Sequence, residues 1–168
     1  MNKEKIQKRL LFIPLLVMTS LLVGCASSKL NVLKPLDSQP NTVSLTLLDN
    51  TVTHVSDEDI GNFKAALSNS LINAGITVVS TERKNVPAIV GEIKEYNEGS
   101  RSLRYFVGFG AGKGSMKTAW KVIDSSRKEV ASCSIDGSIA SGVFGGSFYE
   151  VHDEVAKSFI IFFTSAKE

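Results

Sequence analysis

A run of 14 mostly apolar residues, from Leu10 to Val23, follows a basic start and ends shortly before Cys25. Four Lys and Arg residues and a single acid precede the run, an order that is typical of a secretory signal peptide. A helix needs about 20 apolar residues to cross a bilayer, so the run is too short for a transmembrane helix. We therefore expect residues 1–24 to be removed and the fold to be made by the residues that follow.

The last residues of this leader, Leu22-Val23-Gly24-Cys25, resemble the lipobox of bacterial lipoproteins. The resemblance implies cleavage between Gly24 and Cys25, a diacylglycerol on the Cys25 sulfur and an acyl group such as palmitate on the new amine. Two or more acyl chains hold a protein stably on a membrane. Ala26 follows the cysteine in place of aspartate, and by resemblance to Gram-negative lipoproteins this favours the cell outer membrane, with the domain facing the periplasm. An ordinary signal peptide or an uncut anchor helix is the alternative.

The charge of the mature chain argues against a polyanionic partner. The full sequence has 19 Lys and Arg against 17 Asp and Glu, and residues 1–24 hold four of these bases and one of these acids, which leaves a net charge of −1. Nucleic-acid binding relies on clustered positive charge, so we expect no nucleic-acid partner. If Cys25 carries lipid, Cys133 is the single remaining thiol, and an intramolecular disulfide is excluded.

The 144 residues from position 25 are enough for one domain with a hydrophobic core. Residues 25–41 contain Pro35 and Pro40 among small polar residues, and we expect the lipidated cysteine and a flexible tether there. The apolar residues of this segment leave a short strand, or docking on the domain, as the alternative. The folded domain is expected over residues 42–168.

Local patterns within residues 42–168 predict a two-layer α+β domain in the order β-α-β-β-β-β-α. Strands are expected at 43–48, 76–80, 86–96, 115–124 and 129–139, the first two parallel through a crossover. Ser56 before three acids predicts a helix that ends at Gly75, and an apolar stripe predicts a second helix over 149–166. The last two expected strands alternate between polar and apolar residues. The alternation predicts a mostly antiparallel sheet of about five strands with both helices on one face.

Two glycine-rich loops, 108–115 and 141–148, carry the aromatic residues that we regard as candidate partner-binding positions, Phe109 and Phe144. Exposed, they would form an apolar patch for a partner or a membrane. The alternative is that the loop aromatics cap the open end of the core, which we favour for Phe106 and Phe148. The first loop lacks the leading glycine and the Ser or Thr of a phosphate-binding loop.

The run from Arg104 to Gly112, together with the alternating strand after it, resembles bacterial lipoproteins grouped as domain of unknown function 4410. The resemblance covers about residues 43–166. It implies an envelope lipoprotein and offers no catalytic residues to carry over.

Motifs for catalysis, metals and cofactors are not found in the sequence, and we expect a protein that is not an enzyme and needs no cofactor. His54 and His152 are expected to be solvated surface histidines. The charged run from Glu92 to Glu98 is expected on a solvated strand edge, and Cys133 is expected to be an inert buried thiol.

Three functions therefore stay open. The leading one is a lipid-anchored periplasmic lipoprotein that acts as a non-catalytic binding or assembly module, engaging an envelope protein or another copy of itself. The second is a carrier of a small apolar or lipidic ligand held between sheet and helices. The third is an enzyme of unrecognised type.

Overall fold

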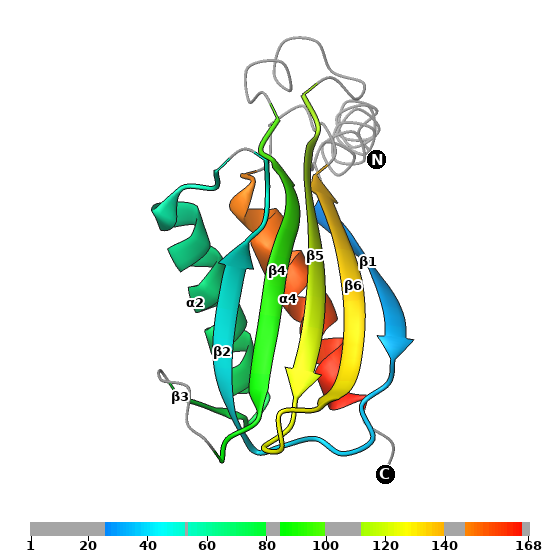
Figure 1. Ribbon diagram of the computed structural model, residues 1–168. Coiled ribbons are helices and arrows are strands. Elements are labelled where there is room, and N and C mark those ends of the chain that lie inside the picture. The colour runs from blue at the N-terminus through cyan, green and yellow to red at the C-terminus, as the bar shows by residue number, and fades with distance from the viewer. Residues whose placement is uncertain (1–25, 53, 80–84, 100–111, 140–146, 166–168) are drawn as a thin grey trace, which may run out of the picture.

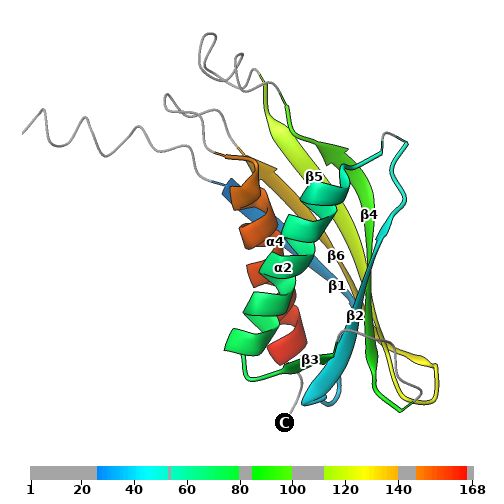
Figure 2. The same cartoon turned by 90° about the vertical axis from the view of Figure 1, so that its left-hand side faces the viewer.

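In the part of the chain that the structure describes, two helices back a single sheet (Figure 1). The computed structural model describes residues 26–52, 54–79, 85–99, 112–139 and 147–165. Within these ranges the elements are β1 (Ala26–Lys34), β2 (Thr42–Asp49), α2 (Asp57–Asn73), β3 (Thr77–Val79), β4 (Ala88–Asn97), β5 (Gly114–Ile123), β6 (Glu129–Ile139) and α4 (Tyr149–Thr164). Figure 2 shows both helices on the same face of the sheet. The predicted two-layer α+β class is confirmed.

The strands of the sheet lie in the order β1-β6-β5-β4-β2-β3. Strands β1, β6, β5 and β4 pair antiparallel, whereas β2 pairs parallel with both β3 and β4. The parallel pairing predicted for the strands on either side of α2 is therefore confirmed.

Strand β1 is one more strand than the five that the sequence predicts. It lies within residues 25–41, where a flexible tether was expected and a short strand was the alternative, and the alternative is correct. It pairs with β6 from Ala26 opposite Ile139 to Val32 opposite Cys133. The hydroxyl of Ser28 donates to the backbone oxygen of Glu154 in α4 over 2.9 Å. Strand β6 and helix α4 both contact β1, so residues 26–34 pack with the domain that was expected over residues 42–168.

Helix α2 begins and ends where its sequence signals lie. The Ser56 side chain accepts a hydrogen bond from the Asp59 amide over 3.1 Å, and this satisfies one of the free amides of the first turn. Three acids in that turn favour the positive end of the helix dipole. Gly75 follows the helix with φ +82°, a backbone angle that glycine adopts without strain.

The core lies between the sheet and the helices and is centred on Trp120. Its ring contacts Phe63 of α2 edge to face and Phe159 of α4, with ring centroids 6.1 and 4.6 Å away. Gly91, on the neighbouring strand β4, leaves room for this ring, since a Cβ there would lie 2.3 Å from Trp120 Cζ3. Cys133 is fully buried, as predicted, and burial raises the pKa of its thiol to about 12.

Strand β4 is not an edge strand, and the prediction that its charged run marks an edge is wrong. It lies between β5 and β2, and exposure places its charges on the face of the sheet that neither α2 nor α4 covers (Figure 2). Glu95 forms an ion pair there with Lys117 of β5, and Glu92 forms one with Lys94. The charged residues therefore keep the uncovered face of an interior strand in water.

Candidate functional site

Four strand ends meet at one end of the sheet, which we call the loop end. Ala26 at the start of β1 pairs with Ile139 at the end of β6, and Ile139 also pairs with Gly114 at the start of β5. Asn97, the last residue of β4, pairs with Ser115. The residues predicted as sites, Gly24, Cys25, Phe109 and Phe144, all lie outside the described residues. Each belongs to a segment that joins the described chain at this end.

Phe148 closes the core beneath the loop end. It is almost fully buried, lies edge to face on Tyr96 with ring centroids 5.0 Å apart, and covers Gly114 so closely that a Cβ there would lie 2.5 Å from its ring. The prediction that Phe148 caps the core is confirmed. Phe106, of which the same was expected, lies outside the described residues.

His152 is buried in α4, with 2% of its surface exposed, and the prediction of a solvated histidine is wrong. Its Nε2 lies 3.1 Å from the hydroxyl oxygen of Tyr96, and its Nδ1 has no hydrogen-bond partner among the described residues. The rings of Phe63 and Tyr149 lie 5.2 and 5.6 Å from the imidazole. The other histidine, His54, is exposed as predicted.

Burial has the largest effect on the pKa values of His152 and Tyr96. Loss of water lowers the pKa of His152, and the nearby carboxylates of Asp59 and Asp153 offset part of that effect. The pKa of Tyr96 is raised, first by burial and then by the Asp59 charge. The imidazole of His152 is therefore buried among aromatic rings, and burial favours its neutral form. Among the described residues, no three His, Cys, Asp or Glu side chains cluster as a metal site.

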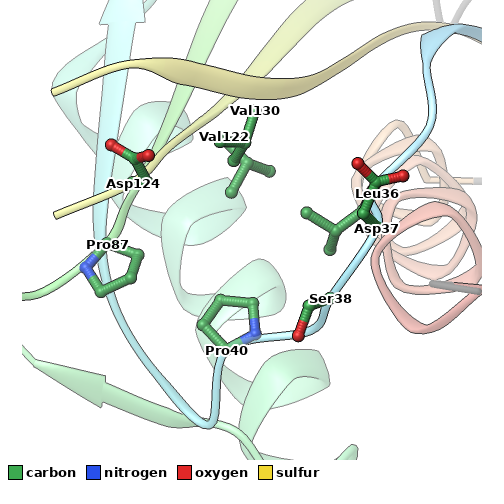
Figure 3. A pocket seen from close by; sticks show the side chains of 8 residues that line it. All are labelled: Leu36, Asp37, Ser38, Pro40, Pro87, Val122, Asp124 and Val130. Atoms are coloured by element: carbon green, nitrogen blue, oxygen red, sulfur yellow. The ribbon is translucent and has the colours of Figure 1, made fainter. Parts of the chain in front are cut away.

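A pocket of about 290 Å³ lies at the opposite end of the sheet, which we call the turn end (Figure 3). Its lining comes from the β1–β2 connection, the start of β4 and the β5–β6 hairpin. It consists of Leu36, Asp37, Ser38, Pro40, Pro87, Val122, Asp124 and Val130. Asp124 is held by the hairpin turn, where its Oδ1 accepts hydrogen bonds from the Ser126 and Lys128 amides. The sequence did not predict this pocket, because its lining comes from three separate segments. Pro40 and Pro87 mark the chain turns that contribute to it.

The outer edge of β1 is a third surface with binding potential. Among the described strands, β1 is the last of the sheet, so one of its sides has no described neighbouring strand. The pairing with β6 shifts between Val32 and Lys34, and at this bulge Val32 and Leu33 are 45% and 64% exposed. On α4, which packs beside β1, Ile161 is exposed as well. Apolar side chains thus accompany an open strand edge.

These features define a two-layer α+β domain with an open sheet edge and a small pocket. Residues 39–143 match the model of a domain of unknown function, DUF4410, and the chain belongs to this family. No curated protein matches the sequence. Within the described residues, no helix has the length and apolar character needed to cross a membrane.

The fold is similar to that of a solved dodecamer, PelC from Paraburkholderia phytofirmans. The match has a TM-score of 0.59 and 14% identity, and covers 84% of this chain and 99% of PelC. A single-substitution variant of the same dodecamer matches with a TM-score of 0.53 and 13% identity over 85% of this chain and 99% of that one. At such identities the likeness extends to the fold alone.

Proposed function

We propose that this chain is a lipoprotein anchored through Cys25 in the outer membrane, with its domain in the periplasm, and that it is a non-catalytic binding or assembly module. The observation that carries the proposal is that a strand of the sheet follows the lipobox-like residues directly, because Ala26, next to Cys25, pairs with Ile139 of β6. A cut between Gly24 and Cys25 leaves this strand whole in the mature chain. The expected processing site is therefore compatible with the described fold.

The polar groups of the core support a role without catalysis. His152 is sealed among aromatic rings, and burial keeps the thiol of Cys133 protonated. A nucleophile or general base needs access to a substrate and a pKa matched to its task. Neither buried group meets these requirements.

Self-association is the form of assembly that the surface favours. An open strand edge offers unpaired N–H and C=O groups to another chain, and exposed Val32 and Leu33 add apolar area. The similar fold of PelC is solved as a dodecamer, which adds support for assembly by a domain of this shape.

The anchor is tested by the intact mass and the membrane fraction of the wild type and of Cys25→Ser. We expect a wild-type chain that starts at an acylated cysteine and sediments with outer membranes, and a substituted chain that does neither. A soluble, unacylated wild type would overturn the anchor.

Assembly is tested by the mass of the detergent-solubilised complex. Leu33→Lys should reduce this mass to that of a smaller species, because it places a charge on the open edge. The matched control is Val52→Lys, at a fully exposed apolar residue outside β1. A wild type that is monomeric, or equal masses for both variants, would argue against assembly through this edge.

The pocket at the turn end favours one second candidate, a carrier of a small apolar or lipidic ligand. Its lining is mostly apolar, as such ligand sites are. Native mass spectrometry of the protein as isolated should then show an additional bound mass that Val130→Phe, which narrows the pocket, removes. Val90→Phe, on the uncovered face of β4, is the control, and an absence of bound mass in the wild type counts against a carrier.

A further inference from the structure

We propose that the loop end of the domain rests directly on the phospholipid surface, with the strands upright and the turn end pointing away from the membrane. The inference rests on the proposed lipid anchor at Cys25. It adds the orientation of the domain and the part of its surface that faces lipid.

The first step is the distance between the anchor and the sheet. Consecutive Cα atoms are about 3.8 Å apart, so Cys25 lies within one residue of Ala26. Ala26 is partly buried and is held in the β1–β6 ladder opposite Ile139. Its neighbour Ser27 pairs with Ser138 in the same ladder, where the two hydroxyl oxygens lie 3.3 Å apart. No spacer is therefore available to let the domain move away from its acyl chains.

The second step is the direction of the strands. β1 runs from the anchor toward the turn end, antiparallel to β6, and the 11 residues of β6 span about 36 Å at roughly 3.3 Å per residue. The β5–β6 turn, which contains Ser126, lies at the far end of this length (Figure 1). An anchor at one end of an upright sheet keeps this turn well away from the membrane.

The third step is the chemistry of the surfaces that could face lipid. At the loop end, Tyr149 is 45% exposed, and a tyrosine ring suits the headgroup layer with its apolar body and polar tip. The uncovered face of the sheet carries charges of both signs, such as the Lys117–Glu95 and Lys121–Glu129 pairs. Such a face offers anionic lipids little net attraction. The loop end is therefore the favoured contact.

The orientation can be measured by fluorescence quenching. The full-length protein is expressed with its own leader, purified in lipidated form and placed in phosphatidylethanolamine and phosphatidylglycerol vesicles that contain a nitroxide-headgroup lipid. A maleimide fluorophore is attached at one of three exposed positions, through Lys113→Cys at the loop end, Ser126→Cys at the turn end or Asn31→Cys on the β1 edge. Cys133 stays unlabelled because it is fully buried.

We expect strong quenching at position 113 and several-fold weaker quenching at 31 and 126. A Gly-Ser spacer of about 12 residues between Cys25 and Ala26 should make positions 113 and 126 alike, because a flexible chain removes the constraint. Equal quenching at 113 and 126 without the spacer, or strongest quenching at 31, would overturn the orientation. Intact mass is recorded on each sample, so a chain without lipid refutes the anchor itself, whereas an acylated chain with equal quenching refutes only the orientation.

Discussion

Nε2 of His152 lies 3.1 Å from the hydroxyl oxygen of Tyr96, which joins α4 to the last residues of β4 at the loop end. Either group can donate in this contact, depending on the histidine tautomer. Burial raises the pKa of the Tyr96 hydroxyl, and the nearby Asp59 charge adds to this effect. Among the described residues, Nδ1 of His152 has no hydrogen-bond partner.

The position of His152 predicts that the fold loses stability in mild acid. Burial lowers the pKa of His152 from 6.5, so the unfolded chain takes up a proton at a pH where the folded chain does not. The contribution of neutral His152 to the free energy of unfolding is complete above pH 6.5. It is lost as the pH falls from 6.5 toward the pKa of His152 in the folded chain. The free energy of unfolding should fall by up to about 1.4 kcal/mol per pH unit in this window.

Urea unfolding at several pH values between 7.5 and 5 measures this loss. His152→Gln should flatten the pH dependence, and His54→Gln, at an exposed histidine beside Asp49, measures the part that the other histidine contributes. A His152→Gln profile parallel to that of the wild type would show that other groups cause the acid sensitivity.

The contact between Gly91 and Trp120 predicts opposite effects of alanine at two glycines. A methyl group at Gly91 would lie 2.3 Å from the Trp120 ring, so Gly91→Ala should destabilise the fold by about 1–3 kcal/mol. Gly61 in α2 has no atom within 4 Å of a new Cβ, and Gly61→Ala should stabilise the fold by about 0.5–1 kcal/mol. Thermal unfolding of the two variants tests both signs, and a neutral Gly91→Ala would mean that Trp120 can move aside.

Local signals were sufficient to locate α2, because the residues that begin and end the helix, Ser56 and Gly75, are recognisable from the sequence at those positions. β1 was harder to predict because its partner β6 lies far along the chain. His152 sits one position from the apolar stripe of α4, and the burial of that position depends on α2, which packs on the helix from a second side. The pocket draws on three separate segments, so no local pattern describes it.

The aromatic residues of the two glycine-rich loops give a prediction about partners. If the loops bind an envelope protein, Phe109→Ser and Phe144→Ser should each reduce the yield of a co-purified complex severalfold. Circular dichroism and the unfolding midpoint of each variant are the controls, and both should stay at wild-type values if the substitutions affect binding alone. Complexes that survive both substitutions would remove the loops as the binding surface.

The hydrogen bond from Trp120 Nε1 to Thr118 Oγ1, 2.8 Å long, gives a prediction about the core. The same hydroxyl donates to the backbone oxygen of Ile135 over 3.2 Å, and the threonine is buried. Thr118→Val keeps the shape of the side chain but leaves the indole N–H without its acceptor. Because a buried unsatisfied donor is costly, we expect a loss of about 1–3 kcal/mol in the free energy of unfolding.

A double-mutant cycle separates this bond from the rest of the core. Trp120→Phe removes the indole N–H and leaves a cavity, so it is destabilising by itself. In the Trp120→Phe background, Thr118→Val leaves no indole N–H without an acceptor. The loss in the free energy of unfolding caused by Thr118→Val should then be smaller by about 1 kcal/mol or more. Thr46→Val, at a partly exposed threonine of β2, controls for loss of a hydroxyl from the sheet. An equal cost of Thr118→Val in both backgrounds would mean that the indole finds another acceptor, and the bond would then not be what holds Trp120 over Gly91.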